Sequence, residues 1–340
     1  MAHPNPRILI VRLSAIGDCV LTTPLLCALR RQFPQAFISW VVQSNCADVL
    51  RGHPCLDELI EVDRGFAKSP SRLWKLRREL QLRRFDVSID PQGLFKSSVV
   101  AWLSGAPQRI GNAGALAREG SDWFNNTCLT THSDHVVDHQ LELLAPLGVR
   151  AGEVEFRLPL GDQARRTVGR FIMDRGFEQY AILNPGAAWE SKVWPVEYYG
   201  QLAQRLAGDG IPCVIAWGGK KERAWAEQVV SHAGVNAVLA PATTLGEFAA
   251  LAARATFFVG SDTGPLHIAA AVGTNCISLH GTTEPHKSGP YGHGHTPIQE
   301  FYQGGTTRQR RTAPNDAMRA IAVDRVYDAC LRTARAKIPA

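Results

Sequence analysis

The chain has 340 residues, of which 45% are hydrophobic and 20% charged, a composition typical of a globular protein long enough for two domains. Its net charge of +6 suits an acidic substrate, a nucleic acid or an anionic membrane surface. No apolar run approaches the roughly 20 residues that span a bilayer, and the eight cysteines form no Cys-x-x-Cys pair, so we expect a cytoplasmic protein without a zinc ribbon or a disulfide framework.

The chain begins with the pattern of a ligand-binding strand and loop. Residues 7–11 form an apolar run typical of a buried parallel strand, and residues 12–18 leave its carboxyl end before helical periodicity begins. Open parallel sheets bind ligands outside the carboxyl ends of their strands, so Ser14, Gly17 and Asp18 lie where chemistry is expected. The alternative for Asp18 is a purely structural helix N-cap.

A basic amphipathic helix is predicted over residues 70–85. Its apolar side carries leucines at helical spacing, and its outward side is rich in cations. The cations are Arg72, Lys75, Arg77, Arg78, Arg83 and Arg84. Such a face either lies on anionic lipid headgroups or is simply solvated.

A second candidate loop follows the strand predicted at residues 86–91. It carries Lys96 and precedes a helix predicted at residues 98–103. Lys96 therefore lies near a strand's carboxyl end, where it either meets a phosphate or is an ordinary first-turn surface residue.

The middle of the chain holds a weak metal candidate and the best linker. His135, Asp138 and His139 precede a helix predicted at residues 140–147, but the sequence nearby offers no further ligands, which argues against a metal site. Residues 150–162 are polar and irregular, as expected of a linker between domains.

The second half repeats the alternation of strands and helices. A strand at residues 180–183 leads into a glycine-containing loop with Lys192, which is well placed to neutralise a phosphate as a point charge. A strand at residues 211–217 leads into a helix with Glu222 in its first turn. Glu222 either accepts hydrogen bonds from a ribose or merely complements the helix dipole.

The stretch TFFVGSDTGPLHIAAAVG, residues 256–273, is the most informative. A buried strand at residues 256–259 is followed by a turn with Asp262 and by a short helix with Pro265 at its first position. The N–H groups and the positive dipole end of such a helix form an anion site. The alternative is an ordinary connection capped by Asp262.

These elements predict an α/β protein with two facing, doubly wound, Rossmann-like domains and a ligand cleft between their strand ends. We place the two domains at residues 1–158 and 163–318. For the C-terminal helix at residues 319–340, packing back on the N-terminal domain is the hypothesis.

Three motifs, each after a predicted strand, resemble those of the glycosyltransferase family 9 heptosyltransferases, enzymes of lipopolysaccharide core assembly. They are R-L-S-A-I-G-D ending at Asp18, N-P-G followed by Lys192 and Trp194, and S-D-T-G-P-L-H-I-A-A with Asp262 and His267. The resemblance implies a GT-B architecture, inversion at the anomeric carbon, and ADP-heptose as donor, with no metal and no further cofactor.

The resemblance also implies that the domain at residues 1–158 binds the acceptor and that the domain at residues 163–318 binds the nucleotide-sugar donor. It implies roles for individual residues as well. Asp18 is expected to be the catalytic general base. The residues expected to bind the donor are Lys192, Glu222, Asp262, Thr263, Gly264, Pro265 and His267. The residues expected near the acceptor or in the cleft are Ser14, Gly17 and Lys96. One departure is that Ala187 and Ala188 stand where some members carry hydroxyl residues.

The sequence therefore predicts an inverting, metal-independent enzyme that moves a heptose from ADP-heptose to the lipopolysaccharide inner core, an acidic, lipid-linked acceptor of Kdo, heptose and lipid A. Its expected location is the cytoplasm, with peripheral contact to the cytoplasmic face of the inner membrane as a further hypothesis. The alternatives are a GT-B enzyme with another nucleotide-sugar donor, a nucleotide-sugar epimerase and a non-catalytic nucleotide-binding protein. No nucleic-acid partner is expected, because the aromatic residues do not interleave with Lys and Arg in any recognised module.

Overall fold

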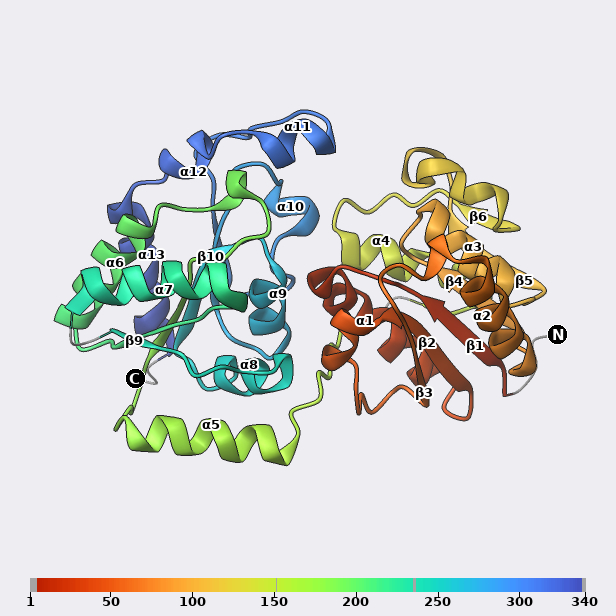
Figure 1. Ribbon diagram of the computed structural model, residues 1–340, viewed down its shortest axis with the longest axis horizontal. Helices are drawn as coiled ribbons and strands as arrows, with labels where there is room; N and C mark the ends of the chain where they lie inside the picture. The colour runs from red at the N-terminus through yellow and green to blue at the C-terminus, as the bar shows by residue number, and fades with distance from the viewer. Residues whose placement is uncertain (1–4, 151, 235–236, 338–340) are drawn as a thin grey trace. The chain divides into compact units, whose positions relative to one another are not determined.

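Apolar strands alternate with helices in both halves of the chain, and each half folds around its own parallel sheet. The computed structural model describes residues 5–150, 152–234 and 237–337 (Figure 1). The chain divides between Pro159 and Leu160 into two compact units, within the stretch predicted to be a linker.

In the part of the first unit that the structure describes there are six strands and four α-helices. The strands are β1 (Arg7–Val11), β2 (Phe37–Gln43), β3 (Glu58–Val62), β4 (Val87–Asp90), β5 (Gln108–Asn112) and β6 (Thr127–Leu129). The helices are α1 (Ile16–Gln32), α2 (Pro70–Leu82), α3 (Phe95–Leu103) and α4 (Val136–Glu142). The strand order is β3-β2-β1-β4-β5-β6, and all neighbours are parallel.

Strand β1 is buried on both faces of the first sheet. Leu9 and Val11 belong to an apolar cluster with residues of α2 and α3, while Ile8 and Ile10, which point to the opposite face, are also fully buried. The continuous apolar run that predicted this strand follows from that double coverage.

The second unit contains six further strands and nine α-helices among the residues the structure describes. The strands are β7 (Ala181–Asn184), β8 (Cys213–Ile215), β9 (Ala237–Leu239), β10 (Phe257–Ser261), β11 (Cys276–Leu279) and β12 (Thr296–Ile298). The helices are α5 (Asp162–Asp174), α6 (Val196–Gly208), α7 (Gly219–Ala233), α8 (Leu245–Ala252), α9 (Gly264–Ala271), α10 (Pro285–Ser288), α11 (Thr307–Thr312), α12 (Asp316–Arg319) and α13 (Val323–Lys337). The strand order is β12-β11-β10-β7-β8-β9, again wholly parallel.

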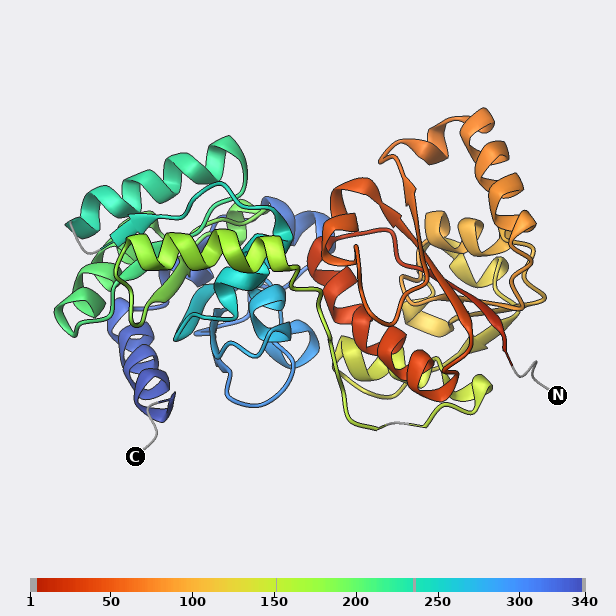
Figure 2. The ribbon, with the colours of Figure 1, turned by 90° about the horizontal axis from the view of Figure 1, so that it is seen from below.

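Helices flank this second sheet as well (Figure 2). Apolar residues of α6, α7 and α13 form one cluster with Phe257 of β10, while Phe258 of the same strand meets Phe248 of α8 with ring centroids 6.3 Å apart. The C-terminal helix, which we expected to pack back on the N-terminal domain, packs against α6 of the second unit. The physical reason is its apolar stripe, since Val326 and Cys330 lie in this core.

The two sheets share one strand order. Counting β7 to β12 as strands one to six of their own sheet gives 3-2-1-4-5-6 in both units. In each sheet the first and fourth strands are therefore neighbours: β1 lies beside β4, and β7 lies beside β10. The second and third strands lie on one side of this pair, and the fifth and sixth lie on the other. Doubly wound sheets bind ligands at the carboxyl ends of strands at such a switch point.

Two helices begin earlier than the sequence predicts. Helix α1 begins at Ile16 and α3 at Phe95, where Ala15 and Leu94 hold the N-cap positions without a side-chain hydrogen bond. The missing cap is replaced from inside the helix, because a polar side chain at the third helical position bonds the N-cap N–H. No helix within the described residues is long and apolar enough to cross a membrane.

Candidate functional site

The loops that follow β1 and β4 are tied together by buried polar contacts in the first unit. Arg12 is 6% exposed, and its Nη1 donates to the carbonyl oxygen of Pro91 at 3.2 Å. The N–H of Leu13 donates to Oε1 of Gln92 at 2.8 Å. Both contacts cross the switch point and fix the two loops relative to each other.

Asp18 lies in the first turn of α1, held by two donors. Its Oδ2 accepts from the N–H of Ala15 at 3.0 Å, and its Oδ1 lies 2.8 Å from Nη2 of Arg12. The alternative that Asp18 is the helix N-cap is wrong, because Ala15 holds that position. The side chain is 44% exposed, so the carboxylate is oriented yet still open to a reactant.

The other predicted residues of the first unit gather at the same edge of the sheet. Lys96 is half-buried in the first turn of α3, and its Nζ donates to Oγ of Ser14 at 3.4 Å. Gly17 is buried one residue before Asp18. The structure thus brings together Ser14, Gly17, Asp18 and Lys96, from the two loops of the first switch point.

The weak metal candidate forms no metal site. Helix α4 begins at Val136 rather than at residue 140, so His135 is its N-cap, accepting from the N–H of Val137, while Asp138 and His139 lie inside the helix. Across the ranges that the structure covers, no three His, Cys, Asp or Glu side chains are grouped to hold a metal ion.

An ion pair crosses the switch point of the second unit. Nζ of Lys192, in the loop after β7, donates to Oδ2 of Asp262 at 3.1 Å and to its carbonyl oxygen at 3.0 Å. Oγ of Ser261 donates back to the carbonyl oxygen of Lys192 at 2.6 Å. These contacts join two loops that lie about seventy residues apart in the chain.

The carboxylate of Asp262 is buried, and both of its oxygens contact other side chains. It is 8% exposed, and its Oδ1 is 3.0 Å from Nε2 of His267. Burial alone would raise the pKa of this carboxyl, but the charge of Lys192 and the hydrogen bond from His267 reverse that effect and hold the pKa well below its usual range. Asp262 is therefore not a helix cap, as the alternative interpretation had it, since Thr263 is the N-cap of α9.

Helix α9 begins immediately beside this ion pair. Thr263, Gly264 and Pro265 are half-buried at its start, and Pro265 is at the second helical position rather than the predicted first, because the helix begins at Gly264. The N–H groups of a first turn lack partners within the helix and carry the positive end of its dipole. An ammonium group has three N–H donors, and the two contacts of Lys192 with Asp262 use two of them. Its third donor and the helix start together can hold an anion.

Glu222 is positioned by glycines on two loops. Its Oε2 accepts from the N–H of Gly218 at 2.8 Å, and burial raises the pKa of its carboxyl. A Cβ at Gly186 would lie 2.4 Å from Cδ of Glu222, so the glycine of the N-P-G motif leaves the room that this carboxyl occupies. The residue lies in the first turn of α7, as predicted.

The structure adds residues to the site that the sequence patterns missed. Asp90 ends β4, is fully buried, and burial raises the pKa of its carboxyl to about 6. His280 follows β11, is fully buried, and its Nε2 lies 2.9 Å from Oγ of Ser278. Ser288 reaches Oδ2 of Asp262 at 3.4 Å. The sequence signal that could have identified Asp90 and His280 as site residues was their position at the carboxyl ends of predicted strands.

Solved structures of glycosyltransferases share this fold. The crystal structure of a family 9 glycosyltransferase from Veillonella parvula matches with a TM-score of 0.87 at 24% identity, covering 99% of both chains. The Escherichia coli heptosyltransferase WaaC with ADP-2-deoxy-2-fluoro heptose matches with a TM-score of 0.75 at 25% identity, covering 96% of this chain and 99% of the other. The fold of two Rossmann-like units is therefore that of the GT-B glycosyltransferases.

The sequence comparisons narrow this class to one family. The family model described as glycosyltransferase family 9 (heptosyltransferase) matches residues 73–317. Lipopolysaccharide heptosyltransferase 1 of Pseudomonas aeruginosa is 31% identical over 310 residues, which covers 84% of this chain and 81% of that protein. The chain belongs to glycosyltransferase family 9, as the motifs indicated.

We expect the Lys192 and Asp262 charges to be strongly coupled. Lys192→Met leaves a buried carboxylate without its cation and should lower the free energy of unfolding by about 3 kcal/mol. Adding Asp262→Asn removes both charges, so the double variant should lose less than the sum of the single losses. Lys221→Met, which breaks the exposed pair with Glu190, is the control and should cost under about 1 kcal/mol. Denaturant unfolding measures the free energy of unfolding of four variants: Lys192→Met, Asp262→Asn, the double variant and Lys221→Met. Equal losses of stability in the Lys192 and Lys221 variants would contradict the coupling.

His280 should make stability depend on pH below neutrality. Burial lowers its pKa from 6.5 to about 4, so between these values the unfolded chain binds a proton that the folded chain does not. The resulting stability is full above pH 6.5 and falls by about 3 kcal/mol towards pH 4. We compare unfolding of the protein and of its His280→Gln variant across this range, since other histidines contribute equally to both. The difference in free energy of unfolding between the protein and the variant should narrow as pH falls. A difference that stays constant would show that the pKa of His280 is not lowered.

Proposed function

We propose that this glycosyltransferase moves a heptose from ADP-heptose to a lipopolysaccharide inner-core acceptor, with inversion at the anomeric carbon and without a metal ion. Lys192 beside the start of α9 is the observation that carries the proposal, because it presents positive potential to a diphosphate. Family membership and the similarity to a heptosyltransferase with bound ADP-2-deoxy-2-fluoro heptose support the choice of donor.

The donor's diphosphate, in this proposal, lies at the start of α9. The free donor of Lys192 and the N–H groups of Thr263 and Gly264 contact its oxygens, while Pro265 fixes the first turn. Asp262 and His267 contact no phosphate and instead hold Lys192 in place. The carboxyl of Glu222 occupies the space that Gly186 leaves by lacking a side chain. It accepts hydrogen bonds from the ribose hydroxyls.

The acceptor hydroxyl is activated by Asp18. The hydroxyl attacks the anomeric carbon on the face opposite the diphosphate, and its proton passes to the carboxylate, which Arg12 and the Ala15 N–H keep oriented. Lys96, beside Ser14, attracts the anionic acceptor. As the bond to the diphosphate breaks, negative charge grows on the leaving group, and Lys192 with the α9 dipole stabilises it.

Asp18→Asn is the direct test of the base. The amide keeps an oxygen for the N–H of Ala15 but cannot take a proton, so kcat should fall by roughly a hundred- to ten-thousand-fold. ADP affinity, measured by calorimetry, should stay within about threefold, because Asp18 contacts no part of the donor in this proposal. Asp48→Asn, on an exposed residue paired with Arg51, should leave kcat unchanged. Lost nucleotide binding, or an unchanged kcat, in the Asp18 variant would show that Asp18 is structural.

Ala187 and Ala188 bear on the choice between ADP-heptose and another nucleotide-sugar donor. These residues lack the hydroxyls that a loop beside phosphates can supply, and Ala188 is exposed. We expect ADP-heptose to be consumed only when acceptor is present, and other nucleotide sugars to be consumed far more slowly. Product analysis by mass spectrometry checks this. Conversion of a nucleotide sugar without acceptor would indicate an epimerase, and binding without any turnover would contradict the transferase.

A lipid-linked acceptor also requires the enzyme to work at a membrane. We include in the proposal a peripheral location on the cytoplasmic face of the inner membrane, because the proposed acceptor is lipid-linked.

A further inference from the structure

We propose that α2, together with the end of α3, forms a docking surface for an anionic lipid bilayer. We call this surface the arginine face. It consists of Trp74, Arg77, Arg78, Leu82, Arg84 and Trp102. The inference concerns a surface of the first unit away from the Asp18 carboxylate, and it stands whether or not the donor and acceptor proposed above are correct.

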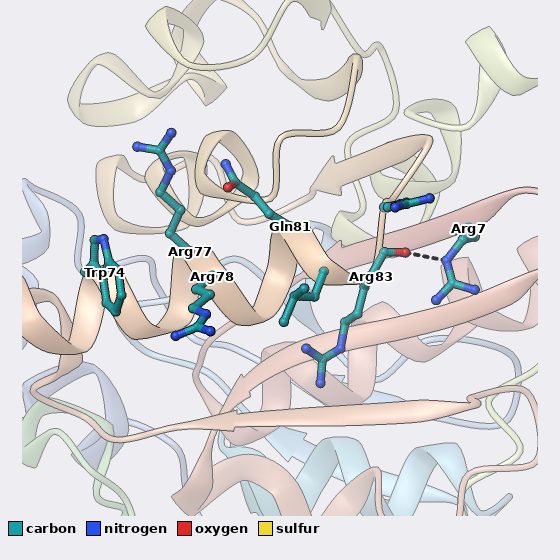
Figure 3. A pocket seen from close by; sticks show the side chains of 8 residues that line it. Arg7, Trp74, Arg77, Arg78, Gln81 and Arg83 are labelled. Atoms are coloured by element: carbon teal, nitrogen blue, oxygen red, sulfur yellow. Dashed lines mark hydrogen bonds between the residues drawn. The ribbon is translucent and has the colours of Figure 1, made fainter.

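A broad groove lies along α2 and reaches the edge of the sheet (Figure 3). Its volume is about 760 Å³, and the lining contains five arginines beside tryptophan and leucine. The lining residues are Arg7, Trp74, Arg77, Arg78, Gln81, Leu82, Arg83 and Arg84. Among these eight residues there is no carboxylate.

Three cations of the arginine face lack an acidic partner. Within the described chain, Arg77, Arg78 and Arg84 are exposed and form no ion pair, whereas Arg83 pairs with Glu58 at 2.6 Å and Arg72 pairs with Asp63 at 3.1 Å. A cluster of exposed, uncompensated guanidinium groups is costly unless it meets anions. Arg77 and Arg78 lie on α2 and Arg84 lies two residues beyond its end, and all three line the same broad groove.

Large apolar side chains accompany these cations in solvent. Trp74 within α2 is 65% exposed, Leu82 at the end of α2 is 74% exposed, and Trp102 on α3 is 46% exposed. The Arg78 guanidinium stacks over the Trp74 ring at 5.9 Å, and the Arg77 guanidinium lies 5.9 Å from the Trp102 ring. Tryptophan beside arginine on the polar face of an amphipathic helix is typical of membrane interfaces, where the ring enters the headgroup layer and the cation binds phosphate.

The opposite side of α2 keeps this face rigid. Leu76 and Leu80 are buried in the core of the first unit, and Ser69 caps the helix by accepting from the N–H of Arg72. The helix therefore cannot rotate its cations inward. A fixed patch of three unpaired cations beside tryptophans suits anionic headgroups, which attract clustered basic side chains near a bilayer surface.

Helix α3 connects the arginine face to the candidate acceptor residues. Lys96 lies in its first turn and Trp102 near its end, which places them about 9 Å apart along the axis. Docking through Trp102 would therefore hold the end of α3 at the headgroups, with Lys96 at the other end of the same helix.

The test is sedimentation of the full chain with lipid vesicles. The chain should pellet with vesicles of equal parts phosphatidylcholine and phosphatidylglycerol, pellet weakly with phosphatidylcholine alone, and be released by added sodium chloride. R77Q/R78Q/R84Q should lower the partition coefficient on the order of a hundredfold, since each cation near an anionic surface contributes about fivefold. W74A should lower it several-fold further.

R165Q/R166Q/R170Q is the matched control, because it removes three exposed cations from α5 in the second unit. It should change the partition coefficient little. Equal losses in the two triple variants, or equal binding to neutral vesicles, would overturn the proposal. Release by inorganic phosphate, but not by chloride at the same ionic strength, would reveal a discrete phosphate site and would also overturn it. Both triple variants should keep their unfolding midpoints and their turnover of a delipidated acceptor, so a failed transferase assay remains separate from failed docking.

Discussion

The buried ion pair between Lys192 and Asp262 is the interaction on which the second unit's site depends. It crosses the point where β7 and β10 lie side by side, and it fixes the loop after one strand against the helix that follows the other. A buried carboxylate is costly without compensation, and here an ammonium group and His267 supply it. The ammonium group, which also lies 4.9 Å from the centroid of the Trp189 ring, is held beside Asp262, two residues before α9 begins. Lys192 therefore compensates Asp262 and lies where the proposal places an anion.

The first unit solves the same problem with different chemistry. Arg12 crosses from the end of β1 to the carbonyl of Pro91 after β4, and also holds the carboxylate of Asp18. In both units a basic side chain therefore closes the switch point of a 3-2-1-4-5-6 sheet. The outcomes differ in exposure, since Asp262 is almost fully covered while nearly half of the Asp18 side chain is open. A covered carboxylate can only position its neighbours, whereas an open one can exchange a proton with a reactant.

Sequence patterns predicted the central strands and the loops of both sites, because parallel strands buried on two faces leave unbroken apolar runs such as residues 256–259. The patterns missed β3, β6 and β12, which all lie at sheet edges. They misplaced the starts of α1 and α3, whose N-caps carry no polar side chain. Sequence patterns could not predict the pairing of Lys192 with Asp262, because only tertiary folding brings residues so distant in the chain together.

The most direct measurement is a crystal structure of the protein with ADP bound. The diphosphate is predicted to lie at the start of α9, within hydrogen-bonding distance of the Lys192 ammonium group and the N–H groups of Thr263 and Gly264, with the ribose against Glu222. Nucleotide bound at the loops of the first unit instead, or at the second unit without contact to Lys192, would contradict the proposed division of labour between the two switch points.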